Sequence, residues 1–129
     1  MPTNVISGSA ALTPAAGPLF LSVTFPLPAR TISLQVFLDD VNLPINSSGD
    51  GPNSVLHCAL SHYSIGNDAS LRNHKVRIVC LITDSNVNHV SANEVDYNVN
   101  GPAFNWNLNN VSNNAAERIT LFDYTITFA

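Results

Sequence analysis

The sequence predicts an all-β protein, an antiparallel and jelly-roll-like β-sandwich of about seven to nine strands. Apolar and polar residues alternate at period two in several short segments, the pattern of strands buried on one face. Clusters of Gly, Pro, Asn and Asp separate these segments. No four-turn stretch has apolar residues at helical spacing without Pro, Gly or Asn intruding. The length predicts a single domain over residues 1–129.

The strands are taken in chain order. Residues 19–25 alternate clearly, with Leu, Leu, Val and Phe on one face. Residues 31–38 and 122–128 show the same pattern, and residues 54–63 are a weaker candidate. Residues 75–83 are apolar on both faces after Arg77, which predicts a strand buried on both sides.

Between these strands we expect turns at residues 26–30, 46–53, 64–68 and 100–102, where turn-forming residues cluster. Residues 112–119 could form one helical turn at most. Residues 11–20 are apolar and rich in Ala and Pro, and we interpret them as an N-terminal arm.

Residues 95–110 predict a β-hairpin, because Asn100-Gly101 is a strong turn signal between two alternating runs. A two-residue loop would set Tyr97 against Phe104. A longer loop that absorbs the following proline would set Tyr97 against Trp106. We favour the longer loop, because a proline directly after the turn cannot donate to the ladder. In either register the polar residues share one face.

Composition limits the classes of partner. Charged residues are only 11 % of the chain and the net charge is −4, with five basic residues in total. Because phosphate contacts supply most non-specific nucleic-acid affinity, we expect no nucleic-acid partner. We also expect no membrane insertion, because prolines interrupt the most apolar stretch, residues 15–29, and a spanning helix needs about 20 apolar residues.

The N-terminal region carries no Lys or Arg before Arg30, so it does not match a secretory leader. The compartment is therefore unknown: the chain is cytoplasmic as made, or a leader has been removed. Cys58 and Cys80 are the only cysteines. Cys80 lies in an apolar run and is expected to pack as a small hydrophobic residue, although a disulfide with Cys58 stays open.

The sequence carries none of the common enzyme signatures. It has no Gly-rich phosphate loop, no HExxH motif and no nucleophile elbow. The four histidines lack the spacing of metal ligands. We therefore expect no enzyme activity, no catalytic residues and no cofactor, and keep a hydrolase of unknown type only as a third hypothesis.

One loop partly matches a calcium site. Asp84, Asn86 and Asn88 occupy the first three alternate ligand positions of a calcium-binding loop, but the required Gly and terminal Glu are not where the motif needs them. A polar loop is the expectation, with no metal site. A non-helical site made by Asp84, Asn86 and Glu94 stays open.

The predicted hairpin also carries groups suited to sugar binding. Sugars need amide and carboxylate partners in fixed directions and an aromatic ring against an apolar sugar face. This hairpin brings together Asp96, Tyr97, Asn105, Trp106 and Asn107, and Tyr63 is a further candidate for the aromatic ring. If the indole of Trp106 is in the core, the amides become a solvated coat or an interface between copies.

Four segments resemble the H-type lectin domain, a small six-stranded β-sandwich that forms trimers and binds sugars such as N-acetylgalactosamine. They are ISG (6–8), VTFPLPARTISLQVFLDD (23–40), VNGPAFNWNL (99–108) and LFDYTITF (121–128). The family's Trp-containing binding segment before the last strand has no clear counterpart here, and the chain is longer.

This resemblance implies a sugar site near the acidic loop of Asp39 and Asp40, and Asn42 follows them in the sequence. The alternative interpretation of Asp39 and Asp40 is a turn that caps its own backbone. Our leading hypothesis is therefore a non-catalytic lectin, a homo-oligomer whose several weak sites bind glycans by avidity. The alternative is a structural self-assembling protein, such as a viral capsid, spike or tail component.

Overall fold

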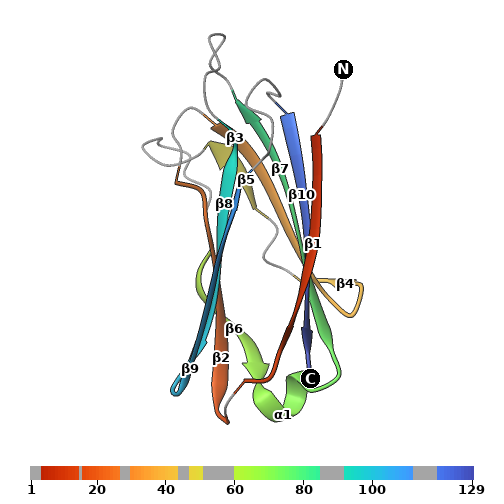
Figure 1. The fold of residues 1–129 in the computed structure, drawn as a ribbon, viewed down its shortest axis with the longest axis vertical. Coiled ribbons are helices and arrows are strands. Elements are labelled where there is room, and N and C mark those ends of the chain that lie inside the picture. Colours follow the sequence, from red (N-terminus) through yellow and green to blue (C-terminus); the bar gives the residue numbers. More distant parts are fainter. Residues whose placement is uncertain are drawn as a thin grey trace.

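The computed structural model describes residues 4–14, 16–26, 30–43, 47–50, 60–84, 92–111 and 119–129. Within them the chain forms ten strands and one short helix, arranged as two sheets that face each other (Figure 1). Two of the strands have four residues or fewer. The prediction of an all-β sandwich is confirmed. The predictions for 54–59 and 112–118, and both alternatives for Cys58, lie outside the described residues.

Sheet A contains the first and last strands side by side. Its order is β1 (Asn4–Leu12), β10 (Ile119–Phe128), β7 (Lys75–Asp84), β3 (Arg30–Leu38) and β4 (Val41–Asn42), and β5 (Ser47–Asp50) also pairs with β3. β1 runs parallel to β10, whereas the other pairs of this sheet are antiparallel.

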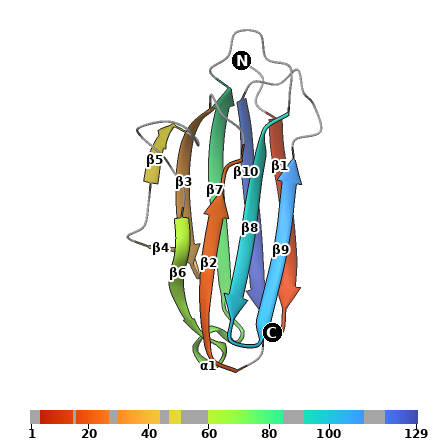
Figure 2. The same ribbon diagram turned by 90° about the vertical axis from the view of Figure 1, so that its left-hand side faces the viewer.

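Sheet B has four strands and is antiparallel throughout. Its order is β6 (Leu60–Asn67), β2 (Pro18–Thr24), β8 (Glu94–Gly101) and β9 (Phe104–Val111). Figure 2 looks onto this sheet and shows β9 at one edge, on the same side of the sandwich as β1. The two sheets therefore end on this side in two long strands, β1 and β9.

The core lies between the sheets and follows the predicted alternation. The inward residues of β2, β3 and β10 are almost all buried, and the largest fully buried side chains include Tyr97, Phe122, Phe128, Leu19, Leu21, Ile32 and Leu34. Each contributes roughly 1.5–3 kcal/mol by leaving water. The strands predicted at residues 19–25, 31–38 and 122–128 are confirmed.

The sequence predicted that β7 is buried on both sides, and this prediction is wrong. Val76, Ile78, Cys80 and Ile82 face the core, but the other face is open and Leu81 is 40 % exposed. Apolar residues on both faces predict two covering layers. In the described residues, however, only sheet B covers sheet A, so the outer face of β7 meets solvent.

Two predicted turns each contain four consecutive strand residues instead. β6 continues through residues 64–67, and β5 lies within the predicted turn 46–53. Gly66 has a positive φ of 132°, a conformation that glycine adopts without strain. Gly66 therefore lies near the end of β6, within the strand, where the sequence predicted a turn.

The helix α1 (Asp68–Leu71) and the strand β1 were not predicted. α1 is a single turn whose N-cap, Asn67, accepts a hydrogen bond from Ser70 N while Ser70 Oγ accepts one from Asn67 N. β1 has small residues on its inward face, such as Gly8 and Ala10, which weakens the apolar signal that alternation depends on.

The β8–β9 hairpin forms, but both predicted registers are wrong. Gly101 pairs with Phe104, so Pro102 and Ala103 make the loop and Tyr97 faces Leu108. Pro suits the first central position of a tight turn because its φ is preset. The turn is therefore centred on Pro102 and Ala103, where the proline does not have to donate a hydrogen bond to the β8–β9 ladder. The shift is an even number of residues, so the predicted division of faces is retained.

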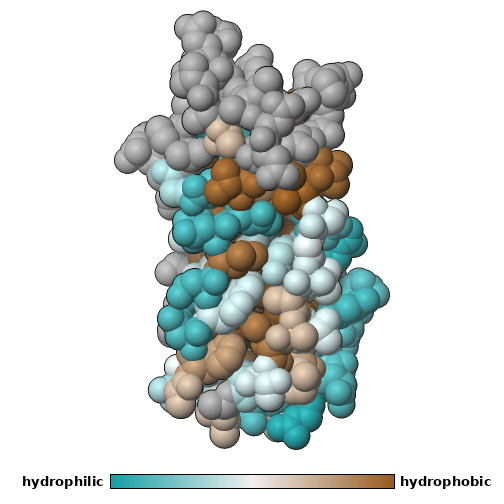
Figure 3. Space-filling model, viewed as in Figure 1, coloured by the Kyte–Doolittle hydropathy of each residue, from teal (hydrophilic) through white to brown (hydrophobic). Residues whose placement is uncertain are grey.

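Between the edge strands β1 and β9 lies a group of aromatic side chains. The ring of Tyr124 stacks on Tyr97 at 5.2 Å between centroids and meets Trp106 at 6.1 Å. Gly8 of β1 leaves room for this ring, because a Cβ there would lie 2.7 Å from Tyr124 Cε1. Trp106 itself is half-buried. In the space-filling view, hydrophobic surface is visible among polar residues on this side (Figure 3).

Candidate functional site

The outer face of sheet B carries a row of asparagines, as predicted from the alternation. Asn98 faces Asn107 across the β8–β9 ladder, and Asn100 faces Asn105. Asn98 Nδ2 donates to Asn105 Oδ1 at 2.8 Å and to Asn107 Oδ1 at 2.6 Å. Asn100 Nδ2 donates to Asn98 Oδ1 at 2.6 Å. The amides are therefore held in fixed orientations by one another.

Two carboxylates continue this row. Glu94 and Asp96 lie two residues apart on β8, so they share the outer face. Hydrogen bonding with Asp96, burial and the charge of Asp96 together raise the pKa of Glu94 to about 7. Glu94 therefore keeps its proton to a higher pH than an isolated glutamate does.

An aromatic residue that sequence reasoning missed lies on the same face. Phe20 pairs with Asn100, and its neighbours Leu19 and Leu21 point into the core. Because side chains alternate along a strand, Phe20 lies on the outer face beside the amides, where it is half-buried. The sequence does contain this signal, because Phe20 lies between two leucines predicted to face the core and must therefore point outward.

The three aromatic residues predicted for a sugar site face inward, and Tyr97 is fully buried. Trp106 and Tyr63 are half-buried and pack against the core. Asp96, Asn105 and Asn107 lie on the outer face of sheet B, which is the opposite face from Trp106. The predicted hairpin site is thus divided between two faces of one sheet.

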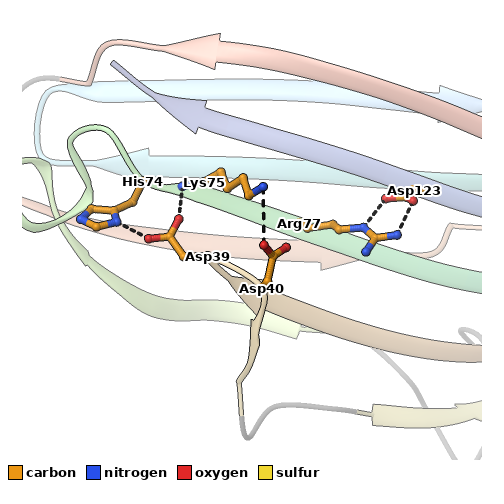
Figure 4. Close-up of polar contacts among 6 residues, drawn as sticks. All are labelled: Asp39, Asp40, His74, Lys75, Arg77 and Asp123. Atoms are coloured by element: carbon orange, nitrogen blue, oxygen red, sulfur yellow. Dashed lines mark hydrogen bonds and ion pairs between the residues drawn. The ribbon is translucent and has the colours of Figure 1, made fainter.

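Asp39 and Asp40 form the tight turn between β3 and β4. Both have positive φ, 47° and 67°, as a two-residue hairpin turn of type I′ requires. The Asp39 carboxylate does not cap its own backbone. It accepts a hydrogen bond from Lys75 N at 3.0 Å and contacts His74 Nδ1 (Figure 4). These contacts, the backbone bond first, hold the pKa of Asp39 below its usual value.

The same face of sheet A carries further ion pairs. Asp40 lies 3.7 Å from Lys75 Nζ, and Arg77 binds both carboxylate oxygens of Asp123, at 2.9 and 2.6 Å. Hydrogen bonds from Arg77 lower the pKa of Asp123. Asn42 is exposed on β4, opposite Phe37. The carboxylate of Asp39 is already occupied, whereas Asp40 and Asn42 stay accessible to a ligand.

The predicted site residues therefore form two groups rather than one. Asp39, Asp40 and Asn42 lie at the β3–β4 turn of sheet A. Asp96, Asn105 and Asn107 lie on the outer face of sheet B, with the core of the sandwich between the two groups.

Asp84 takes part in a buried polar cluster. It pairs with Arg30 at 3.5 Å, and Arg30 Nε donates to Asn93 Oδ1 at 2.7 Å. Asn93 Nδ2 donates to Thr120 Oγ1 at 2.9 Å. Asn86 lies outside the described residues, and Glu94 is on the outer face of sheet B. Among the residues that the structure describes, no three His, Cys, Asp or Glu side chains come together as metal ligands.

Comparisons with known proteins found no match: no family model fits the sequence, and neither a curated protein nor a solved structure resembles it significantly. In the described part of the chain, no helix has the length and apolar character needed to cross a membrane.

Proposed function

We propose that the protein is a non-catalytic structural subunit that associates with copies of itself. The observation that carries this proposal is the side of the sandwich where β1 and β9 form the edges. β1 has nine residues and β9 has eight, and neither contains a charged residue or a proline. Natural proteins usually protect long edge strands with charge, proline or bulges, because an open edge can pair with another chain.

The outer face of sheet A supports the same proposal. Val5 of β1 pairs with Leu121 of β10, and Leu121 pairs with Leu81 of β7. Val5 is 55 % exposed and Leu81 is 40 % exposed. An apolar row crosses three strands here, which suits contact with another protein surface.

The mass of the purified protein in solution tests the proposal. We expect light scattering after size-exclusion chromatography to give a discrete oligomer or a larger particle whose population rises with concentration. Electron microscopy then distinguishes a small oligomer from a shell or fibre. A monomer at about 100 μM, well above the dissociation constants of most stable assemblies, would overturn the proposal.

A second candidate function is glycan binding on the outer face of sheet B. It is favoured by the ordered amides of Asn98, Asn105 and Asn107, with Phe20 beside them as an aromatic surface. This differs from the predicted site, since Phe20 takes the place of Trp106. The accessible residues of the β3–β4 turn, Asp40 and Asn42, are the alternative location.

A glycan array followed by two substitutions tests this second candidate. Asn105→Ala on sheet B and Asp40→Ala on sheet A are both exposed changes. If the amide face binds the sugar, only Asn105→Ala weakens a glycan found on the array, whereas loss through Asp40→Ala alone would place the sugar at the β3–β4 turn. An array without any binding would leave self-association as the sole proposal.

A further inference from the structure

We infer that two copies join through the outer edge of β9, running antiparallel across a two-fold axis. The two four-stranded B sheets would then form one continuous eight-stranded sheet. This inference rests on the proposed self-association and identifies the surface and the partner: a second copy of this chain.

β9 is a long and regular edge strand of the sandwich, as is β1. It pairs with β8 through eight consecutive residue pairs without a register shift. At the opposite edge of sheet B, the β2–β6 ladder has two register shifts, and Gly66 there has a positive φ. At that end of sheet A, β4 and β5 have two and four residues. A straight, regular edge is the better template for a new strand.

The outward side chains of β9 are complementary to themselves. Asn105, Asn107 and Asn109 are exposed on its outer face. In an antiparallel pair across a two-fold axis, each residue of β9 lies opposite a residue of the second copy whose side chain points to the same face. This follows because side chains alternate with period two. An amide donates and accepts, so amide can bond amide, as Asn98 and Asn107 already do within the chain at 2.6 Å. A carboxylate or an amine would repel its own copy.

The inward side chains of β9 add apolar area. Phe104, Trp106 and Leu108 are half-buried at the open side of the sandwich. A second β9 beside the first would place the same three residues against them, and cross-strand aromatic and aliphatic pairs stabilise a sheet. β1, the other long edge, offers small inward residues such as Gly8 and Ala10 and so gains less. These differences favour β9 over β1 as the strand that pairs with the second copy.

Charge substitution at Asn107 tests the inference. We expect Asn107→Lys and Asn107→Glu each to weaken dimerisation about fivefold or more, because like charges then lie close to the axis. Mixing the two variants restores a dimer, which native mass spectrometry detects as a heterodimer. Asn107→Ala removes the same hydrogen bond with Asn98 without adding charge, and it stays dimeric. Circular dichroism confirms that each variant is folded.

The outcomes separate this inference from the proposed function. If wild type is a monomer, both fail. If wild type associates and Asn107→Lys leaves the association unchanged, self-association stands and the β9 interface is wrong. A loss of association in Ser9→Lys, on the exposed face of β1, with none in Asn107→Lys would place the interface at β1. Hydrogen–deuterium exchange gives an independent measure, since β9 amides must become more protected as concentration rises.

Discussion

At the scale of single residues, Gly8 controls how tightly the β1–β9 side can pack. Its missing side chain lets β1 approach the ring of Tyr124, which is only 8 % exposed. That ring is held on its other sides by Tyr97 and Trp106. It therefore has little freedom to move away from a new methyl group.

We expect Gly8→Ala to lower the free energy of unfolding by about 1–3 kcal/mol, the usual cost of overpacking. Urea denaturation measures this. Ser7→Ala is the matched control, because Ser7 is exposed on the same strand and should change stability by no more than about 0.5 kcal/mol. Equal stability of Gly8→Ala and wild type would show that Tyr124 can yield.

Glu94 gives a pH-dependent prediction. Its pKa rises from 4.5 to about 7 in the folded protein, chiefly through hydrogen bonding with Asp96. Between these values the folded state binds more protons than the unfolded chain, so stability falls as the pH rises through this window. We expect the urea midpoint of wild type to decrease from about pH 5 to about pH 8 relative to Glu94→Gln. Parallel pH profiles for the two proteins would contradict this.

Single residues also show what a sequence pattern can and cannot give. Alternation correctly divided inward from outward residues in most strands, including Trp106 and the amides. It could not give the partners of Asp39, because His74 and Lys75 come from a distant segment of the chain. A carboxylate that looks available in the sequence is already hydrogen-bonded in the fold.

At the scale of elements, the turn from β6 into α1 depends on one cap. Asn67 Oδ1 accepts from Ser70 N at 2.8 Å, and Asn67 N donates to Ser70 Oγ at 3.0 Å. Together these bonds close a capping box at the start of the helix.

We expect Asn67→Ala to cost about 1 kcal/mol of stability, the usual effect of losing an N-cap. The thermal or urea midpoint of the variant measures the loss. Ser64→Ala changes another exposed position of β6 and should have little effect. If both variants lose equally, the cap is not what stabilises this turn.

The hairpin register and β1 were predicted wrongly for two different physical reasons. The register of the β8–β9 hairpin depends on where Pro102 sits in the turn. The favoured longer loop centres the turn on Gly101 and Pro102, whereas the observed turn centres on Pro102 and Ala103. β1 was not predicted because Gly and Ala on its inward face contribute little apolar signal. The predicted arm, residues 11–20, contains the end of β1 and the start of β2 instead. Its pairing with β10 is a long-range contact that local periodicity does not contain.

At the scale of the whole molecule, the Arg30 cluster joins the two sheets. Arg30 and Asp84 start β3 and end β7 in sheet A, and Asn93 precedes β8 of sheet B. Asp84 is 1 % exposed and Arg30 is 6 % exposed. Removing one partner of such a pair leaves the other charge buried without it, which is expensive.

We expect Asp84→Asn to destabilise the protein by about 3–5 kcal/mol. Asp40→Asn is the control, because the exposed Asp40–Lys75 pair should contribute less than about 1 kcal/mol. Urea denaturation compares the two. A loss in Asp84→Asn no greater than in Asp40→Asn would mean that the cluster does not hold the sheets together.

The fold class could be predicted from the sequence because period-two alternation and turn residues are local signals. The candidate sites could be predicted only in part. The sequence indicated the amide row, but which aromatic residue shares its face follows from the pairing of β2 with β8, which brings Phe20 beside Asn100. That pairing joins distant segments of the chain, so local sequence patterns do not contain it.

The parallel pairing of β1 with β10 has a consequence for how the molecule folds. It brings Asn4 beside Thr120 and Leu12 beside Phe128, so nearly the whole chain forms one loop whose closure costs entropy. Because local contacts form before long-range ones, we expect the β8–β9 hairpin to form early and β1 to dock last. We expect refolding on the order of milliseconds to seconds. Stopped-flow mixing measures this rate, and refolding that is complete within the dead time of the instrument would contradict the expectation.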